Sequence, residues 1–142
     1  MSQQEILEAI PHRKPMLLID EIVSQTEDHI ICKKTFDAEE FFYQGHYPEA
    51  PITPGIILCE AGMQAGAILL SKLLADQEGV PVVTRLTNAK FKKMVRPGDT
   101  VSLEVHLGER LKNTYFMKAK VTNGEKLAVT FEFACTMANA KL

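Results

Sequence analysis

The chain has 142 residues, of which 46% are hydrophobic and 24% charged, so length and composition fit one globular domain over 1–142. The formal net charge of -2 argues against a general nucleic-acid-binding protein, which is usually strongly basic. The three cysteines are odd in number and lack a CxxC spacing, so we expect no disulfide framework, no metal site and a reducing compartment.

The first third of the chain is predicted to contain a short helix followed by two strands. Ser2 can cap a helix that runs to Ile10, where Pro11 ends it. Two β-like runs and one helical turn are expected next, at 16–24, 29–36 and 38–43.

A stiff loop and a long apolar helix are predicted in the middle of the chain. Residues 45–55 include three prolines and two glycines, a composition that is incompatible with regular structure. Thr53 is a good N-cap and Pro54 suits the first helical position, so a helix is predicted to begin there. It is expected to continue to about Ala75, before Pro81.

The second half is predicted to consist of strands. Four runs are expected to be strands, at 82–94, 100–108, 114–122 and 126–137, and the last three alternate apolar and polar residues. Turns are expected at 97–99 and at Asn123-Gly124, the latter a strong hairpin signal. The order of elements predicts an α+β fold with an antiparallel sheet packed on a helix.

The long helix has apolar side chains on nearly all sides, so we expect it to be buried. Gly62 and Gly66 each cost a helix interior about 1 kcal/mol relative to alanine, which suggests that close packing is needed there. Glu60 and Gln64 are the strongly polar residues between 56 and 70, and they share one helix face. Burial would raise the pKa of the Glu60 carboxyl group and make it a useful general acid; the alternative is a carboxylate at a wet rim.

Two further groups are candidates for chemistry near the start of this helix. His46 lies just upstream and is a candidate general base, although a loop histidine bonded to the backbone is the alternative. The N–H of Gly55 is in the first helical turn, where it can hold a developing oxyanion unless the turn is simply solvated. Cys59 is expected to pack as a small hydrophobe rather than act as a nucleophile. The other histidines are expected to be structural or surface residues: His12, His29 and His106.

Several segments resemble the FabZ-type (3R)-hydroxyacyl-acyl carrier protein dehydratases. Residues 10–20, IPHRKPMLLID, are similar to the opening motif of this family, and 91–99 are similar to a later strand and turn. Four further segments resemble the active-site block of the family: Gly45-His46-Tyr47-Pro48, Pro51-Ile52, Pro54-Gly55 and Glu60-Ala61. The resemblance implies a hot-dog fold, an antiparallel β-sheet wrapped around a long central α-helix. It also implies a cytoplasmic hydro-lyase of fatty acid biosynthesis that forms trans-2-enoyl-acyl carrier protein without a cofactor.

The resemblance also implies a catalytic site shared between two subunits of a homodimer, alone or as a trimer of dimers. His46 of one subunit would remove the C2 proton, and Glu60 of its neighbour would protonate or orient the departing hydroxyl group. The N–H of Gly55 would hold the thioester oxygen, and an apolar tunnel beside the helix would hold the acyl chain. Contact with the substrate is expected from Tyr47, Pro48 and Gln64.

The resemblance also implies a role for a cluster of basic residues. Acidic acyl carrier protein is expected to dock on Lys90, Lys92, Lys93 and Arg96, with an ordinary solvated strand face as the alternative. Nucleic acid and membrane insertion are not expected. Two other functions remain open. One is a hot-dog acyl thioesterase, and the other is a non-catalytic acyl-binding subunit, which would not need both His46 and Glu60.

Overall fold

The computed structural model describes residues 3–75 and 79–138, so the predicted cap residue Ser2 lies outside the described part. In chain order its elements are α1 (Gln3–Ala9), β1 (Glu21–Gln25), β2 (His29–Thr35), η1 (Phe41–Gln44), α2 (Gly55–Leu73), β3 (Val80–Phe91), β4 (Thr100–Leu111), β5 (Thr114–Asn123) and β6 (Lys126–Ala138).

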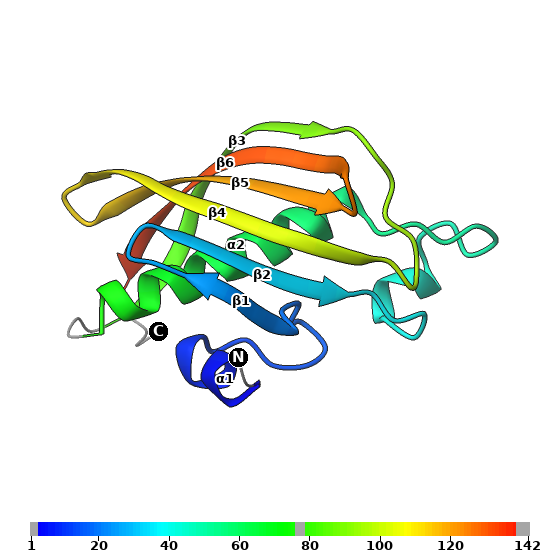
Figure 1. The fold of residues 1–142 in the computed structure, drawn as a ribbon, viewed down its shortest axis with the longest axis horizontal. Coiled ribbons are helices and arrows are strands. Elements are labelled where there is room, and N and C mark those ends of the chain that lie inside the picture. The colour runs from blue at the N-terminus through cyan, green and yellow to red at the C-terminus, as the bar shows by residue number, and fades with distance from the viewer. Residues whose placement is uncertain (1–2, 76–78, 139–142) are drawn as a thin grey trace.

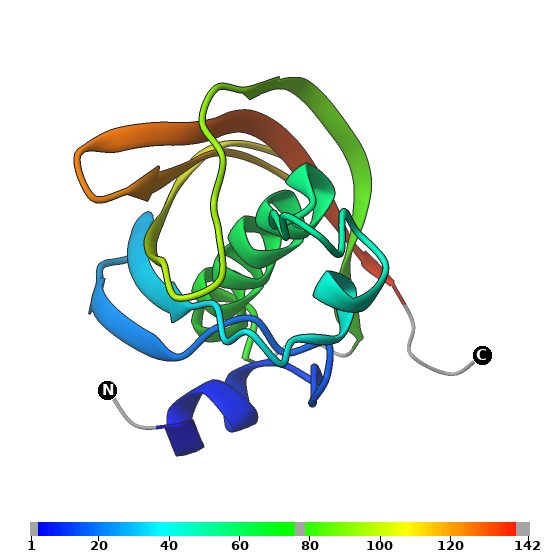
Figure 2. The same ribbon diagram turned by 90° about the vertical axis from the view of Figure 1, so that its right-hand side faces the viewer.

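One curved sheet wraps around the long helix. The six strands pair antiparallel in the order β1-β2-β4-β5-β6-β3. Figure 1 shows the strands lying along α2, and Figure 2, which looks nearly along the helix, shows the sheet bending around it. The short helix α1 lies outside the sheet and packs beside α2. This is the predicted α+β arrangement.

Close packing between α2 and the sheet explains the two glycines in the helix. A Cβ atom built on Gly62 would lie 2.7 Å from the ring of Phe131, and one built on Gly66 would lie 2.6 Å from the ring of Phe133. Both phenylalanines are buried residues of β6. Glycine is therefore present at both positions despite its low helix propensity, because any side chain here would push the helix away from the sheet.

The predicted strand at 16–24 is wrong in its first half, because β1 begins only at Glu21. The side-chain amide of Gln64 bonds the backbone of this earlier segment, accepting from the N–H of Leu18 at 2.8 Å and donating to the carbonyl of Met16 at 2.7 Å. These backbone groups therefore pair with α2 instead of with a neighbouring strand. The predicted helical turn forms a few residues later than expected, as η1.

Both predicted turns in the second half of the chain are present. Gly98 and Gly124 adopt positive φ angles of 93° and 65°, which glycine adopts at no steric cost. The four predicted strands of this half correspond to β3, β4, β5 and β6.

The helix α2 passes a length and composition test for a membrane span, with a mean hydropathy of 1.4. However, 61% of that window is buried against the rest of the chain. The apolar composition of α2 is therefore explained by its place in the core of the fold.

Candidate active site

The loop before α2 is held to the body of the protein at Thr53. The N–H of Thr53 donates to the carbonyl of Val95 at 2.7 Å, and its hydroxyl lies 2.6 Å from the hydroxyl of Tyr43. The prediction that Thr53 caps the helix is wrong. The helix begins at Gly55 with Pro54 in the cap position, because the Thr53 side chain is engaged by Tyr43 instead.

His46 lies in this loop with one ring nitrogen occupied. Its Nδ1 is 3.0 Å from the carbonyl oxygen of Ile52. Because a carbonyl only accepts, Nδ1 carries the proton, and Nε2 of the neutral ring is left as a free base. This is the bond to the backbone that was predicted from the sequence as the alternative for His46, and it fixes the orientation of the ring. Tyr47 packs its ring against the edge of the imidazole, with centroids 4.8 Å apart. Both Tyr47 and Pro48 are exposed.

Glu60 lies one and a half turns into α2, and Gln64 and His12 surround its carboxylate. Gln64 Nε2 donates to Oε2 at 2.8 Å, and His12 Nε2 lies 3.7 Å from the same oxygen. The Glu60 side chain is 29% exposed, so the expected burial is only partial within one chain. Gln64 is 1% exposed and its amide is fully used by Glu60, Met16 and Leu18, which favours a positioning role over the predicted contact with substrate.

His12 is a residue of the site that the sequence reasoning missed, since it was expected to be structural or on the surface. It comes from the segment after α1 and reaches Glu60 across 48 positions of the chain. Its Nδ1 is buried and has no hydrogen-bond partner among the described residues. The one available signal was its place in the motif at 10–20.

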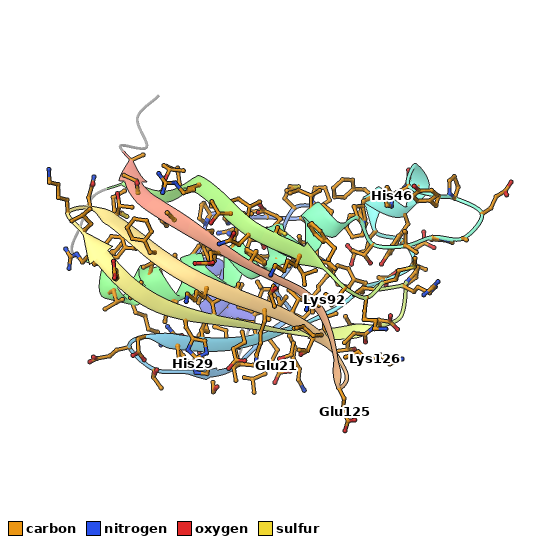
Figure 3. The ribbon with its side chains drawn as sticks, turned by 90° about the horizontal axis from the view of Figure 1, so that it is seen from above. Glu21, His29, His46, Lys92, Glu125 and Lys126 are labelled. Carbon is orange, nitrogen blue, oxygen red and sulfur yellow. The ribbon has the colours of Figure 1, made fainter. Side chains whose placement is uncertain are left out.

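Within one chain, His46 and Glu60 do not pair. No hydrogen bond or ion pair joins them in the described residues, where Ile52 is the hydrogen-bond partner of His46 and Gln64 that of Glu60. Figure 3 shows His46 on the loop that projects at one end of the molecule. If His46 and Glu60 act in one site, direct contact within one chain is therefore not what brings them together.

The N–H of Gly55 is available at the helix start. No acceptor for it is found in the described part of the chain, where the first bonded amides of α2 are those of Ile57 and Leu58 to the Pro54 carbonyl. The exposed ring of Phe91 lies directly over Gly55 and would meet any Cβ atom there. The turn thus offers a free donor beside an apolar ring.

A cavity of about 530 Å³ lies beside the second half of α2. Its walls come from α1, the following segment, α2 and the start of β3, and include Ile10, Pro11, His12, Leu70, Leu74 and Val80. The cavity is lined mostly by apolar residues, and His12, in its wall, lies 3.7 Å from the Glu60 carboxylate.

The predicted basic cluster is spread over a strand end and a loop. All four members are exposed at the end of β3 and in the loop that follows it. Lys90 lines a groove on the outer face of the sheet together with Lys118 and Lys120, whereas the other three do not line that groove.

A FabA-like domain model matches residues 10–132. The chain belongs to the FabA-like family. Within this family it is 38% identical over 132 residues to a 3-hydroxyacyl-[acyl-carrier-protein] dehydratase FabZ of Clostridium perfringens, covering 93% of this chain and 95% of that protein. It is 44% identical over 111 residues to the FabZ of Pseudothermotoga lettingae, covering 78% and 77%. The FabZ of Syntrophobacter fumaroxidans is 35% identical, with 99% and 97% covered. The predicted resemblance to FabZ-type dehydratases is confirmed.

Solved structures confirm the predicted hot-dog fold. The dehydratase heterocomplex ApeI:P of Xenorhabdus doucetiae has a TM-score of 0.81 at 13% identity, with 95% of this chain and 91% of that chain covered. The PaaI protein of E. coli has a TM-score of 0.66 at 17% identity, with 82% and 81% covered. At such identities the likeness establishes the fold, while the reaction class rests on the FabA-like family.

Proposed function

We propose that the protein removes water from (3R)-hydroxyacyl-acyl carrier protein to give trans-2-enoyl-acyl carrier protein, as one dehydratase domain of fatty acid biosynthesis. Membership of the FabA-like family and the FabZ relatives carry the reaction class. The observation that carries the mechanism is the hydrogen bond from His46 Nδ1 to the Ile52 carbonyl, because it leaves Nε2 as a base.

In the proposed reaction, Nε2 of His46 takes one proton from C2 of the substrate. The electron pair of that C–H bond moves toward the thioester carbonyl, whose oxygen gains negative charge. The free N–H of Gly55 and the dipole of α2 stabilise that charge. The pair then forms the C2–C3 double bond as the C3–O bond breaks.

Glu60 gives its proton to the departing hydroxyl group, which leaves as water. The proton taken by His46 replaces it through solvent, so the enzyme returns to its starting state. Gln64 and His12 hold the Glu60 carboxyl group in place, and both are positioning residues in this scheme.

We infer that His46 and Glu60 meet across a homodimer interface on strand β3. This strand is at the edge of the sheet, and it presents an exposed apolar row of Val82, Val83, Leu86 and Phe91. A long apolar edge strand is normally covered, and a second copy pairing along β3 would cover it. Phe91 lies over Gly55, so the same pairing would bring the partner to the start of α2. Three such dimers could assemble further.

The acyl chain is proposed to enter the cavity beside α2. The basic residues at the end of β3 and in the next loop would attract acidic acyl carrier protein. Burial of α2 within its own sheet supports a water-soluble enzyme, and we propose a cytoplasmic location. The proposed dehydration needs no cofactor.

The test is turnover of a 3-hydroxyacyl-carrier thioester, followed by absorbance of the conjugated product, with thiol release measured in parallel. His46→Ala and Glu60→Gln should each lower kcat by on the order of 100-fold or more. The matched control is Glu125→Gln, an exposed carboxylate in the β5–β6 hairpin that is labelled in Figure 3. Near-normal rates in both variants would reject the mechanism, and thiol release without enoyl product would indicate a thioesterase.

Mixing the two inactive variants tests whether the site is shared. In a mixed dimer one site has both mutated groups and the other has both native groups. If subunits exchange freely, half of the dimers are mixed and half of their sites work, so about a quarter of the wild-type activity should return. No recovery after verified subunit exchange would show that both groups act within one chain.

A further inference from the structure

Two histidines and a glutamate meet on the outer face of the sheet. His29 of β2 is directly opposite His106 of β4 in the strand register. Glu104 precedes His106 by two positions, so alternation along the strand places both on the same face. The neighbours Leu103 and Val105 point inward and are fully buried. The fold therefore fixes three potential ligands on one side of two adjacent strands.

Their donor atoms converge on a single carboxylate oxygen. His29 Nε2 lies 2.6 Å from Glu104 Oε2, and His106 Nε2 lies 3.5 Å from the same oxygen. The two imidazole rings stack with centroids 4.2 Å apart, and all three donor atoms lie within 4.8 Å of one another. Small rotations of the rings about their Cβ–Cγ bonds would direct both lone pairs to one point.

An ion pair with Lys120 decides which oxygen of Glu104 faces the histidines. Lys120 Nζ is 3.2 Å from Oε1, so the second oxygen, Oε2, is the one that faces the histidines. Lys118, opposite His106 on β5, adds another positive charge nearby.

Room for further ligands is present. Glu104 and His106 line a groove of about 570 Å³ that runs across the outer face of β3, β4, β5 and β6. Solvent in this groove could complete a coordination sphere. The site is separate from His46: Figure 3 shows His29 on the side of the sheet, well away from His46 on its loop.

We propose that His29, Glu104 and His106 form a binding site for a divalent transition metal ion of the Zn²⁺ type. Two imidazole nitrogens and one carboxylate oxygen are a common donor set for zinc, with the fourth position left to water. Nickel, copper and cobalt ions accept the same nitrogen donors. Metal binding would take the place of the His29–Glu104 hydrogen bond, and the neutral His29 ring would then carry its proton on Nδ1 while Nε2 binds the ion.

The bound ion would join β2 to β4. Because it binds a folded arrangement in which His29 meets Glu104 across 75 positions of the chain, it should raise the unfolding temperature in a concentration-dependent manner. The ammonium group of Lys120 opposes the cation, so its removal should strengthen binding. This charge effect distinguishes the proposed site from metal bound elsewhere.

The experiment is titration of the tag-free, chelator-treated full chain with Zn²⁺ by calorimetry and with Co²⁺ by visible absorbance. We expect one ion per chain in the micromolar range and a rise in the unfolding temperature. His29→Ala, His106→Ala and Glu104→Gln should each weaken binding by at least about 10-fold. Lys120→Gln should strengthen it by at least about threefold.

The matched control is Glu132→Gln, a carboxylate in the same groove whose side chain pairs with Asn88 and not with a histidine. It should bind metal as the wild type does. Folding of each variant is checked by circular dichroism before titration. Absence of micromolar binding in the wild type, or binding that survives all three ligand substitutions, would overturn the proposal. Loss of binding only in His12→Ala or His46→Ala would assign the metal to the other histidines and would also overturn it.

Discussion

The ring of Phe91 lies against the backbone of Gly55, so that a Cβ atom built there would be 2.6 Å from two ring carbons. Phe91 ends β3 and Gly55 begins α2, so this contact joins the edge of the sheet to the proposed oxyanion site. The ring of Phe91 can therefore lie this close to the backbone only because residue 55 has no side chain.

Gly55→Ala should lower kcat on the order of 10-fold, because its methyl group would enter the space beside the proposed oxyanion. Stability should fall by about 1 to 3 kcal/mol, since the ring of Phe91 has to move aside and the proposed pairing along β3 would cover it. Steady-state kinetics and urea unfolding measure the two effects. The double variant with Phe91→Ala separates the causes: rescue of kcat would mean that ring displacement, and not blockage of the oxyanion site, was responsible.

Gln64→Leu should destabilise the protein by about 2 to 4 kcal/mol, because it leaves the Leu18 N–H and the Met16 carbonyl without their buried partner. It should also lower kcat, since Glu60 loses the amide that orients it. Gln4→Leu, at an exposed position on α1, is the control and should have little effect. Equal unfolding free energies for the two variants would contradict the role given to Gln64.

Gly62→Ala and Gly66→Ala should each destabilise the fold by about 1 to 3 kcal/mol, since the new methyl groups overlap the rings of Phe131 and Phe133. An exposed helix would instead gain about 1 kcal/mol from the same change. Gly45→Ala is the control for stability, because a Cβ atom there meets nothing within 4 Å. Urea unfolding decides the sign, and a stabilising effect at Gly62 would contradict the packing described.

The three thiols should be almost unreactive in the folded protein. Burial raises the pKa of Cys59 to about 11 and the pKa of Cys32 and Cys135 to about 12, so each remains protonated at pH 8. A disulfide reagent added at pH 8 should react slowly with native protein and rapidly with all three thiols in guanidinium. Rapid reaction of one thiol in the native state would identify an opening that the structure lacks.

Ala67→Leu should shorten the range of acyl chains that the enzyme accepts. Ala67 lines the cavity beside α2, and the added methyl groups would occupy part of it. The value of kcat/KM should fall for long-chain substrates more than for short-chain ones, because only long chains reach this depth. An equal fall for both would place the acyl chain elsewhere.

Local sequence patterns determined the main elements of this fold. The apolar run with its internal glycines predicted α2, and alternation predicted the last three strands, because both depend on neighbours a few residues apart. The same local signals singled out His46 in a proline-rich loop and Glu60 in an apolar helix.

Only the tertiary structure decided which distant groups meet. Gln64 bonds Leu18 across 46 positions, and His29 meets Glu104 across 75, and no periodicity in the chain reports such pairs. The physical reason is that strand register and helix placement follow from packing of the whole core, which satisfies buried backbone groups wherever partners happen to lie. Because of that packing, β1 begins later than predicted and the Thr53 hydroxyl bonds Tyr43 instead of capping α2. The same packing places His12 beside Glu60.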